Sequence, residues 1–325
     1  MNEKLDTTPL KALLLLITAA FSCQISICEI LYSSLFTVEI APVLNKIVTA
    51  HKGKPMKACS HKYVHGYSER ENERLVDQAT TLTELLHKDT RYPPGAIVLE
   101  VGCGVGAQTI TLVTHSPETC FTCMDITETS LNTAKARIKS SGYENAAFLN
   151  ADIFDLPFLD SSFDHIFVCF VLEHLKNPIG ALFHLKAKLK NNGTITVIEG
   201  DHGSTFFHPD SKEAWQTIQC LIDLQAKGGA NSLIGRQLFP LMTQAGFKNI
   251  TVSPRMVYVD SNFPDYVEGF TKNTFIAMVE GVRDPSLGSG MIDEATWEKG
   301  IKDLYRTTES DGTFCYTFFK GIAYK

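Results

Sequence analysis

The sequence has no excess of basic residues. Its 325 residues include 30 lysines and arginines against 36 aspartates and glutamates, which gives a net charge of −6. Proteins whose main partner is DNA or structured RNA usually carry a basic surplus that neutralises phosphates. The charge balance therefore argues against a nucleic-acid partner.

Cysteines are present, but they lack the pattern of a metal site or a disulfide framework. Cys120 and Cys123 form one C-x-x-C pair, and no second pair or nearby pair of histidines completes a zinc set. Cys103 lies among glycines and Cys169 lies in an apolar run. We therefore expect reduced thiols that pack as small apolar side chains, no metal, and a cytoplasmic protein.

The apolar run near the N-terminus is too short to span a bilayer as it stands. Residues 12–21 are apolar and follow two lysines, as in the core of a signal peptide, whereas a spanning helix needs roughly 20 such residues. Further apolar residues extend the segment to 12–36. Three interpretations of residues 1–55 remain open: a signal peptide, an anchor or packing helix with weak membrane association, and a gene start placed too early, with Met56 as the true start.

From residue 68 onwards, helix and strand patterns alternate, which is typical of a mostly parallel sheet covered on both faces. Strands are predicted at 96–101, 120–124, 147–150, 163–170, 194–199, 249–259 and 313–319. Helices are predicted at 68–87, 107–116, 128–140, 178–190 and 211–227, before Gly246, and at 264–282 and 293–308. The fold class is therefore α/β, a Rossmann-like, doubly wound, mostly parallel seven-stranded sheet. The last two helical insertions are predicted to form a lid over the strand ends.

Glycines cluster where the first strand meets the next helix, in Glu100-Val-Gly102-Cys103-Gly104-Val-Gly106. In a Rossmann-like sheet this loop lets a ligand lie directly on the backbone. A dinucleotide site has the spacing G-x-G-x-x-G, whereas the spacing here is G-x-G-x-G. Glu100 would repel a pyrophosphate and suits a cationic group. The loop therefore favours an adenosyl ligand over NAD.

Residues 98–106 resemble the first motif of class I S-adenosylmethionine-dependent methyltransferases, of the small-molecule type found in ubiquinone biosynthesis. Three further segments continue the resemblance in order: Asp125 at the end of the second strand, Asn150 to Phe158, and Phe163 to Leu175. The resemblance covers residues 63–200. It implies transfer of a methyl group from S-adenosylmethionine to a small organic acceptor.

The resemblance also divides the chain and assigns roles to residues. Residues 56–92 would be a cap and first helix, 93–205 the S-adenosylmethionine-binding core, and 206–325 the rest of the sheet with substrate-lid helices. The predicted cofactor-binding residues are Tyr63, Tyr67, Glu100, Gly102, Cys103, Gly104, Gly106, Asp125, Ile126, Asp152, Ile153, Phe170 and His174.

Each of the specific contacts has a plainer alternative. Asp125 would hold the ribose hydroxyls, or only start a helix, and Asp152 would contact the adenine amino group, or only cap a turn. Ile126 and Ile153 would sandwich the adenine, although a core would also need apolar residues there. The two N-terminal tyrosines would cover the methionine end of the cofactor, where an aromatic face suits the sulfonium, or merely anchor a surface loop.

His202 follows the fifth strand, beyond the carboxyl ends of the strands, where ligands of such sheets bind. A histidine can act as general base near neutral pH, which matters only if the acceptor arrives protonated. His202 is the first catalytic candidate, followed by Tyr67 and Glu173. Asp201, His202 and His208 could instead form a metal site, but their spacing matches no established ligand pattern.

Missing motifs narrow the acceptor. No Asn/Asp-Pro-Pro-Phe/Tyr element follows the fourth strand, as it does in amino-methylating nucleic-acid enzymes, and no Pro-Cys dipeptide offers a cytosine-C5 nucleophile. A small organic acceptor remains, methylated at oxygen, nitrogen or carbon. An NAD-dependent oxidoreductase and a non-catalytic S-adenosylmethionine-binding module are the alternatives. The oligomeric state, including a homo-oligomer, is left open.

Overall fold

The computed structural model of the chain describes residues 69–325. The predictions for residues 1–55, for the start of the cap segment, and for Tyr63 and Tyr67 lie outside the described residues. Between residues 69 and 325, no helix combines the length and the apolar character that crossing a bilayer requires.

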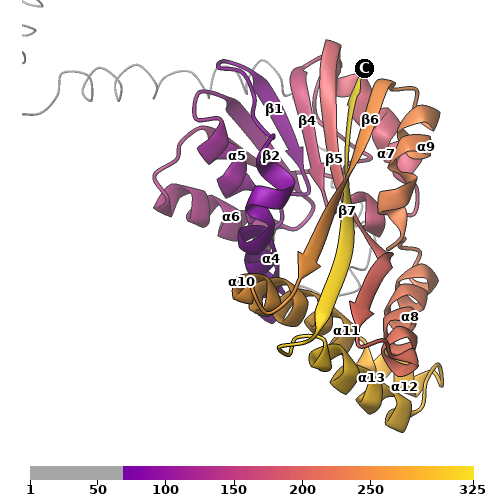
Figure 1. The fold of residues 1–325 in the computed structure, drawn as a ribbon. Coiled ribbons are helices and arrows are strands. Elements are labelled where there is room, and N and C mark those ends of the chain that lie inside the picture. The colour runs from indigo at the N-terminus through magenta and orange to yellow at the C-terminus, as the bar shows by residue number, and fades with distance from the viewer. Residues whose placement is uncertain (1–68) are drawn as a thin grey trace, which may run out of the picture. The chain divides into compact units, whose positions relative to one another are not determined.

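Seven strands form one sheet in the order β3-β2-β1-β4-β5-β7-β6, as Figure 1 shows. The parallel strands are β1 (Ile97–Val101), β2 (Cys120–Asp125), β3 (Ala146–Asn150), β4 (Phe163–Cys169) and β5 (Leu189–His208). The antiparallel strand β7 (Thr313–Tyr324) lies between β5 and β6 (Lys248–Val259). The predicted Rossmann-like, mostly parallel, seven-stranded α/β fold is confirmed.

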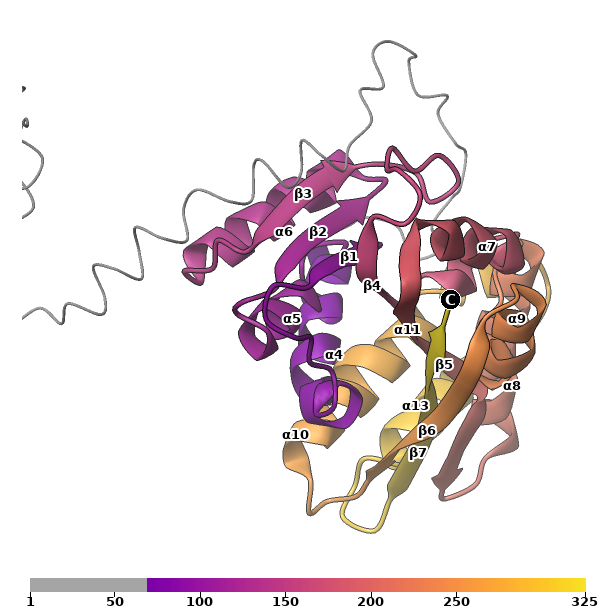
Figure 2. The same cartoon turned by 90° about the horizontal axis from the view of Figure 1, so that it is seen from above.

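The central strands are apolar on both faces because helices cover both sides of the sheet. Val98 and Leu99 of β1 are fully buried, as are Ile166, Phe167 and Val168 of β4. Figure 2 shows α4 (Glu69–His87), α5 (Thr109–His115) and α6 (Glu128–Ser140) on one side, and α7 (Pro178–Lys188) and α9 (Leu238–Gln244) on the other. The carboxyl ends of the parallel strands are thereby left at one edge, where the site forms.

Sequence signals fix several helix starts. Asn177 caps α7 by accepting a hydrogen bond from the backbone of Gly180, and Pro178 follows at the first helical position. Ser211 caps α8 (Lys212–Lys227) in the same way. Asp293 caps α13 (Glu294–Arg306). These three predicted helices are therefore found within three residues of the expected boundaries.

The fifth strand is longer than predicted. It runs for 20 residues and pairs with β7 past a register shift between Asp201 and Phe206. Residues 191–193, between the predicted helix at 178–190 and the predicted strand at 194–199, lie inside β5, since α7 ends at Lys188 and the chain becomes extended at once. The extra length arises because β7 supplies antiparallel partners beyond the end of β4. His202 consequently lies within a strand instead of after one.

The segment predicted as one helix at 264–282 has three parts. They are α10 (Pro264–Tyr266), the π-helix η3 (Val267–Ile276) and α11 (Ala277–Glu280). Long π-helical turns are rare and frequently occur at functional sites. Phe270 and Met278, from this segment, both line the pocket described below. The lid role of the segment stays a prediction.

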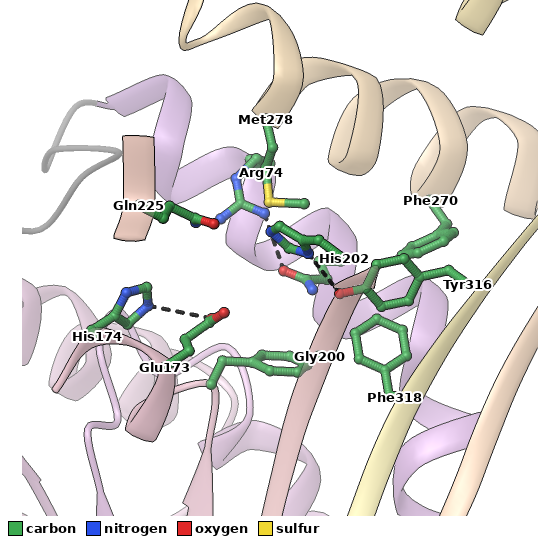
Figure 3. Close-up of a pocket in the computed structure, with 12 residues that line it drawn as sticks. Arg74, Glu173, His174, Gly200, His202, Gln225, Phe270, Met278, Tyr316 and Phe318 are labelled. Atoms are coloured by element: carbon green, nitrogen blue, oxygen red, sulfur yellow. Dashed lines mark hydrogen bonds and ion pairs between the residues drawn. The ribbon is translucent and has the colours of Figure 1, made fainter. Parts of the chain in front are cut away.

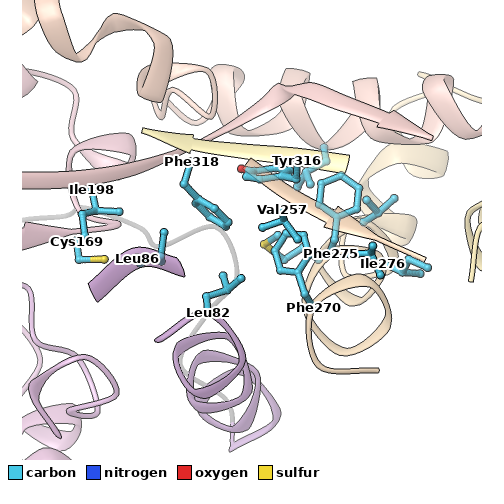
Figure 4. Close-up of a cluster of buried hydrophobic side chains, with 14 of the residues drawn as sticks. Leu82, Leu86, Cys169, Ile198, Val257, Phe270, Phe275, Ile276, Tyr316 and Phe318 are labelled. Carbon is cyan, nitrogen blue, oxygen red and sulfur yellow. The ribbon is translucent and has the colours of Figure 1, made fainter. Parts of the chain in front are cut away.

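Aromatic side chains of β7 form the core between the sheet and these helices, as Figure 4 shows. The Tyr316 and Phe318 rings lie 4.7 Å apart, and Phe275 lies 4.9 Å from Phe314. Leu82 and Leu86 of α4 pack against the same cluster. These aromatic side chains therefore form core, and Phe270, Tyr316 and Phe318 also reach the pocket described below.

A buried lysine joins α4 to β7. Lys320 is 1% exposed, and its Nζ donates hydrogen bonds to the backbone oxygen of Leu86, to Asp89 Oδ1 at 2.6 Å and to Thr90 Oγ1 at 2.6 Å. Asp89 also pairs with Arg255 of β6. Burial alone would raise the pKa of Asp89, but the hydrogen bonds from Lys320 and Arg255 lower it to about 2. The end of α4 is thus held against the antiparallel strands.

Candidate functional site

The glycine-rich loop is suspended between β1 and β2. The backbone N–H groups of Gly102 and Cys103 donate to the oxygen of Met124 at 2.8 and 3.0 Å. Gly102, Gly104 and Gly106 all have positive φ, a conformation that other residues rarely adopt. The loop therefore needs glycine at these three positions before any ligand is considered.

The three glycines differ in what surrounds them. A Cβ at Gly102 would lie 2.4 Å from Val171 Cγ2, and one at Gly106 would lie 3.0 Å from Cα of Ala134 in α6. A Cβ at Gly104 would have nothing within 4 Å. The outer two glycines are therefore required for packing, whereas the middle one faces an open space in which a ligand could lie on the backbone.

Asp125, the last residue of β2, is bonded to this loop. Its Oδ2 accepts a hydrogen bond from the Gly104 N–H at 2.9 Å, and its Oδ1 accepts one from Thr127 N–H at 2.8 Å. Burial raises the pKa of Asp125, although hydrogen bonds from these backbone groups oppose the rise. A carboxylate is therefore held beside the open glycine. Its contact with ribose hydroxyls stays a prediction.

Glu100 is buried below the loop and is 2% exposed. Its Oε2 accepts a hydrogen bond from Thr109 Oγ1 at 2.7 Å, at the start of α5. Burial raises the pKa of Glu100 to about 7, and the charge of Asp125 adds to the rise. Glu100 therefore braces the exit of the loop, and its contact with a cationic group stays a prediction. Burial also raises the pKa of Cys103 in the loop.

The expected adenine side lies at the ends of β2 and β3. Asp152 caps a local turn, since its Oδ1 accepts from the Phe154 N–H at 2.9 Å. Ile126 is 41% exposed, whereas Ile153 is buried. An exposed isoleucine beside Asp125 provides an apolar surface for a flat ligand. The adenine contacts of these three residues stay predictions.

The turn after β4 is strained and held from β5. Phe170 adopts a φ of 58°, which is uncommon for a bulky residue. Glu199 of β5 is fully buried, and its Oε1 accepts hydrogen bonds from the Val171 and Leu172 N–H groups at 3.1 and 2.7 Å. Burial raises the pKa of Glu199 well above its usual value, and the nearby Glu173 adds to the rise. Sequence reasoning missed Glu199.

A pocket opens at this turn, at the carboxyl end of β4 and beside the middle of β5, as Figure 3 shows. Its empty volume is about 500 Å³, including space open to solvent. Its lining combines polar and apolar side chains with one glycine: Arg74, Gln78, Phe170, Glu173, His174, Gly200, His202, Gln225, Phe270, Met278, Tyr316 and Phe318. Because Val171 in the same turn packs against Gly102, the pocket adjoins the glycine-rich loop.

Two of the three predicted catalytic candidates line this pocket together. His202 is 4% exposed, and its Nδ1 lies 2.8 Å from Tyr316 Oη. Glu173 Oε1 lies 3.4 Å from His174 Nε2. His174 and Phe170, predicted as cofactor contacts, line the same pocket. The third catalytic candidate, Tyr67, lies outside the described residues.

The alternative metal site is not assembled. Arg236 binds Asp201 through two hydrogen bonds of 2.6 and 2.8 Å, and His208 lies at the far end of β5. Over residues 69–325, no group of three or more His, Cys, Asp or Glu side chains is arranged to hold a metal ion.

Sequence reasoning missed the pocket residues that come from distant segments. Arg74 and Gln78 project from α4, and Gln225 projects from α8. Arg74 Nη1 donates to Gln78 Oε1 at 3.1 Å. Nothing in the local sequence around these residues signals a site, because the fold alone brings them together.

Residues 99–195 match a protein family described as a methyltransferase domain. These residues are a methyltransferase domain. The match confirms the family predicted from the glycine-rich loop and its three companion segments. The methyltransferase domain contains β1 to β4, the turn after β4 and the first part of β5.

Several curated proteins resemble part of the chain. A demethylmenaquinone methyltransferase of Staphylococcus aureus is 29% identical over 41% of this chain and 55% of its own length. A malonyl-[acyl-carrier protein] O-methyltransferase of a Paenibacillus species is 28% identical over 47% of this chain and 55% of its own length. An uncharacterized 37.1 kDa protein in a Streptomyces fradiae transposon is 31% identical over 60% of this chain and 56% of its own length. The chain spans about half the length of the curated relatives it matches.

Solved structures include a phosphoethanolamine N-methyltransferase of Haemonchus contortus in complex with S-adenosyl-L-methionine. It has 14% sequence identity and a TM-score of 0.47, and the match covers 77% of this chain and 52% of that chain. A putative methyltransferase from Bacillus halodurans has 15% sequence identity and a TM-score of 0.47, and the match covers 76% of this chain and 98% of that chain.

Proposed function

We propose that the chain is an S-adenosylmethionine-dependent methyltransferase that acts on a small organic acceptor. The observation that carries the proposal is the open backbone at Gly104, bonded to Asp125 and adjoining a pocket through the contact of Gly102 with Val171. A cofactor on the loop and an acceptor in the pocket would then be neighbours. Methyl transfer requires this proximity, since alignment can supply on the order of 7–11 kcal/mol.

The described residues fit the cofactor. The backbone of residues 102–106 would carry the cofactor, because Gly104, alone among the three glycines of this loop, faces open space and has no Cβ to fill it. Asp125 would bind the ribose, and Asp152 with Ile126 and Ile153 would bind the adenine. When bound, S-adenosylmethionine supplies a methyl group activated by a sulfonium. The domain match supports this cofactor over NAD. The two alternatives, an NAD-dependent oxidoreductase and a non-catalytic S-adenosylmethionine-binding module, are distinguished by the experiments below.

The lining of the pocket supports a small organic acceptor with an apolar body. Phe170, Phe270 and Phe318 supply apolar walls, and a few polar side chains face the same space. Glu173 and His202 are the polar groups that could handle a proton of the acceptor. The atom that receives the methyl group is left open.

A cytoplasmic location is part of the proposal. The six cysteines of the described residues are all free thiols, which is the usual state in a reducing compartment. The lack of a nucleic-acid partner, the weak membrane association through residues 12–36 and the homo-oligomer stay predictions.

Calorimetric titration with S-adenosylhomocysteine, and separately with NAD, tests the cofactor. We expect S-adenosylhomocysteine to bind, and its Kd to rise at least about tenfold in Asp125→Ala, since each 1.4 kcal/mol lost is a factor of ten. Asp284→Ala, at a side chain that is 94% exposed on α12 (Arg283–Gly288), is the matched control. Binding of NAD alone would overturn the proposal.

Methyl transfer itself is tested with S-adenosylmethionine labelled in its methyl group. The protein is incubated with the label and a deproteinised cell extract, and labelled products are identified by mass. We expect a labelled small molecule. We also expect His202→Ala to lower the rate of transfer with little change in S-adenosylmethionine affinity, and an unchanged rate would remove His202 from the mechanism.

A further inference from the structure

Glu199 of β5 caps the turn after β4, although it lies on a different strand. Its side chain is fully buried, and its Oε1 accepts hydrogen bonds from the backbone N–H groups of Val171 and Leu172 at 3.1 and 2.7 Å. These groups open the short 3-10 helix η1 (Leu172–His174), and the first N–H groups of a helix have no partner within it. Val171, at the cap position, makes no side-chain hydrogen bond to the helix. Glu199 therefore supplies the cap that the local sequence lacks.

The turn needs this cap because its backbone is strained. Phe170 ends the ladder between β4 and β5, where its N–H donates to the oxygen of Ile198 at 2.9 Å, and it then adopts a φ of 58°. A bulky residue rarely takes this conformation, which persists only where the surroundings fix it. The two hydrogen bonds to Glu199 come directly after Phe170 in the chain. They therefore fix the direction in which the turn leaves the sheet.

The same turn contacts both parts of the candidate site. On one side, Val171 lies so close to Gly102 that a Cβ added there would come within 2.4 Å of Val171 Cγ2. On the other side, Phe170, Glu173 and His174 line the pocket, and Figure 3 shows Glu173 and His174 at its wall. The turn is therefore the segment that joins the glycine-rich loop to the pocket.

The surroundings of Glu199 favour its neutral, protonated form. Its Oε2 is buried and has no hydrogen-bond partner among residues 69–325, a position in which an ionised oxygen is unfavourable. Burial raises the pKa of Glu199 well above its usual value, and the charge of Glu173 adds to the rise. A glutamine has the same length and keeps an oxygen that can occupy the place of Oε1, so it mimics the neutral acid. A methionine also has this length but offers only a weak acceptor.

We propose that Glu199 is a positioning residue, which places Glu173 in the pocket and Val171 against the glycine-rich loop through one pair of hydrogen bonds. Glu199 is fully buried and is not among the residues that line the pocket, so it acts through the turn and not by touching a ligand. Its effect on the reaction follows because methyl transfer depends on the alignment of cofactor and acceptor. That effect rests on the proposed methyltransferase function and deepens it, whereas the capping of the turn does not depend on it.

Amide hydrogen exchange on the full chain tests the cap and needs no ligand. We expect the Val171 and Leu172 amides to be protected in the wild type, and amides that exchange as freely as in an unfolded chain would overturn the proposal. In Glu199→Met they should exchange at least about tenfold faster, the effect of losing one hydrogen bond, whereas Glu199→Gln should keep the wild-type rates.

The Ile97 amide is the internal reference for this measurement. It donates to Asp164 Oδ2 at 3.0 Å at the opposite end of β1, so it reports changes that affect the whole sheet. Exchange in Glu199→Met that increases no more at the turn than at Ile97 contradicts the cap. Faster exchange at the turn in Glu199→Gln contradicts it equally, so the wild-type and glutamine results decide the matter even if the methionine variant does not fold.

Cofactor binding and methyl transfer test the link between the two parts of the site. In Glu199→Met we expect the Kd for S-adenosylhomocysteine to rise and the rate of label transfer to fall, each at least about tenfold, and Glu199→Gln to restore both to within about threefold of wild type. Asp164→Leu, which removes another carboxyl that accepts from a backbone N–H, is the matched control and should change neither. A loss confined to one of the two quantities contradicts the link. A wild-type chain that does not bind S-adenosylhomocysteine would instead refute the proposed function, and hydrogen exchange would still decide the role of Glu199.

Discussion

The two ends of the sheet build their parts of the site in different ways. At the β1–β2 end, the candidate cofactor surface consists of a backbone loop and one carboxylate, all within residues 100–125. At the β5–β7 end, the pocket is made of side chains that range from Arg74 to Phe318. The first surface is local in sequence and the second exists only after folding.

This difference matches what each surface has to recognise. A backbone loop presents the same N–H groups whatever side chains surround it, so it suits a ligand that is common to many enzymes. A pocket of side chains can change with each substitution, so it suits an acceptor particular to one protein. The extension of β5 and β7 beyond the parallel sheet, which carries His202 and Tyr316, is therefore the part of the chain that we expect to set substrate choice.

The largest expected effect is on the backbone surface. Gly104→Val would put methyl groups into the space where the cofactor is proposed to lie, so we expect the Kd for S-adenosylhomocysteine to rise at least about 100-fold. Stability should fall by only about 1–2 kcal/mol, the cost of a side chain at positive φ. Calorimetry and urea unfolding measure the two quantities.

Gly95→Val is the matched control for this change. Gly95 has a φ of +74°, a Cβ added there would also have nothing within 4 Å, and the residue precedes the opposite end of β1. We expect the same loss of stability with unchanged affinity. Equal affinities in the two variants would mean that Gly104 faces no ligand.

Glu100 gives a pH-dependent prediction at the same end of the sheet. Its pKa is raised from 4.5 to about 7, so between these values the folded chain keeps a proton that the unfolded chain has lost. The free energy of unfolding of the wild type should therefore fall as pH rises through this window, whereas that of Glu100→Gln should not, because glutamine carries no titrating proton. At about 1.4 kcal/mol for each pKa unit, the difference in unfolding free energy should shift in favour of the variant by up to about 3 kcal/mol between pH 4.5 and pH 7.

Urea unfolding of both proteins at pH 5, 6 and 7.5 checks this expectation. His87 changes stability in the opposite direction, because burial lowers its pKa to about 4 and protonation below its unfolded pKa favours the unfolded chain. That contribution is the same in both proteins and cancels in their difference. A difference that does not vary with pH would show that Glu100 is already ionised in the folded chain.

Sequence patterns predicted the local end of the molecule well. The strand, glycine loop and helix near Gly104, and Asp125 at the end of β2, follow from apolar runs and spacing within 30 residues. Besides the pocket residues named above, the length of β5, the π-helix and the partner of His202 escaped prediction. Each depends on a segment about 100 residues away or on packing against one, since β7 provides both the ladder that extends β5 and the hydroxyl of Tyr316.

The smallest expected effect concerns the joint between the two ends. Lys320 of β7 donates to Asp89 and Thr90, which follow α4 and lead into β1, so Lys320→Met should loosen the contact between them. Breaking a buried ion pair costs about 3–5 kcal/mol of stability. Asp89 is 44% exposed and water can solvate it in the variant, so we expect the free energy of unfolding to fall by about 2 kcal/mol. Lys302→Met, at an exposed lysine of α13, is the control for the loss of one charge, and the stability of both variants is measured by urea unfolding.

Because Arg74 and Gln78 reach the pocket from α4, the Lys320 variant should weaken methyl transfer more than it weakens S-adenosylhomocysteine binding. Equal losses in the two would mean that the joint holds the whole sheet together and does not specifically position the pocket.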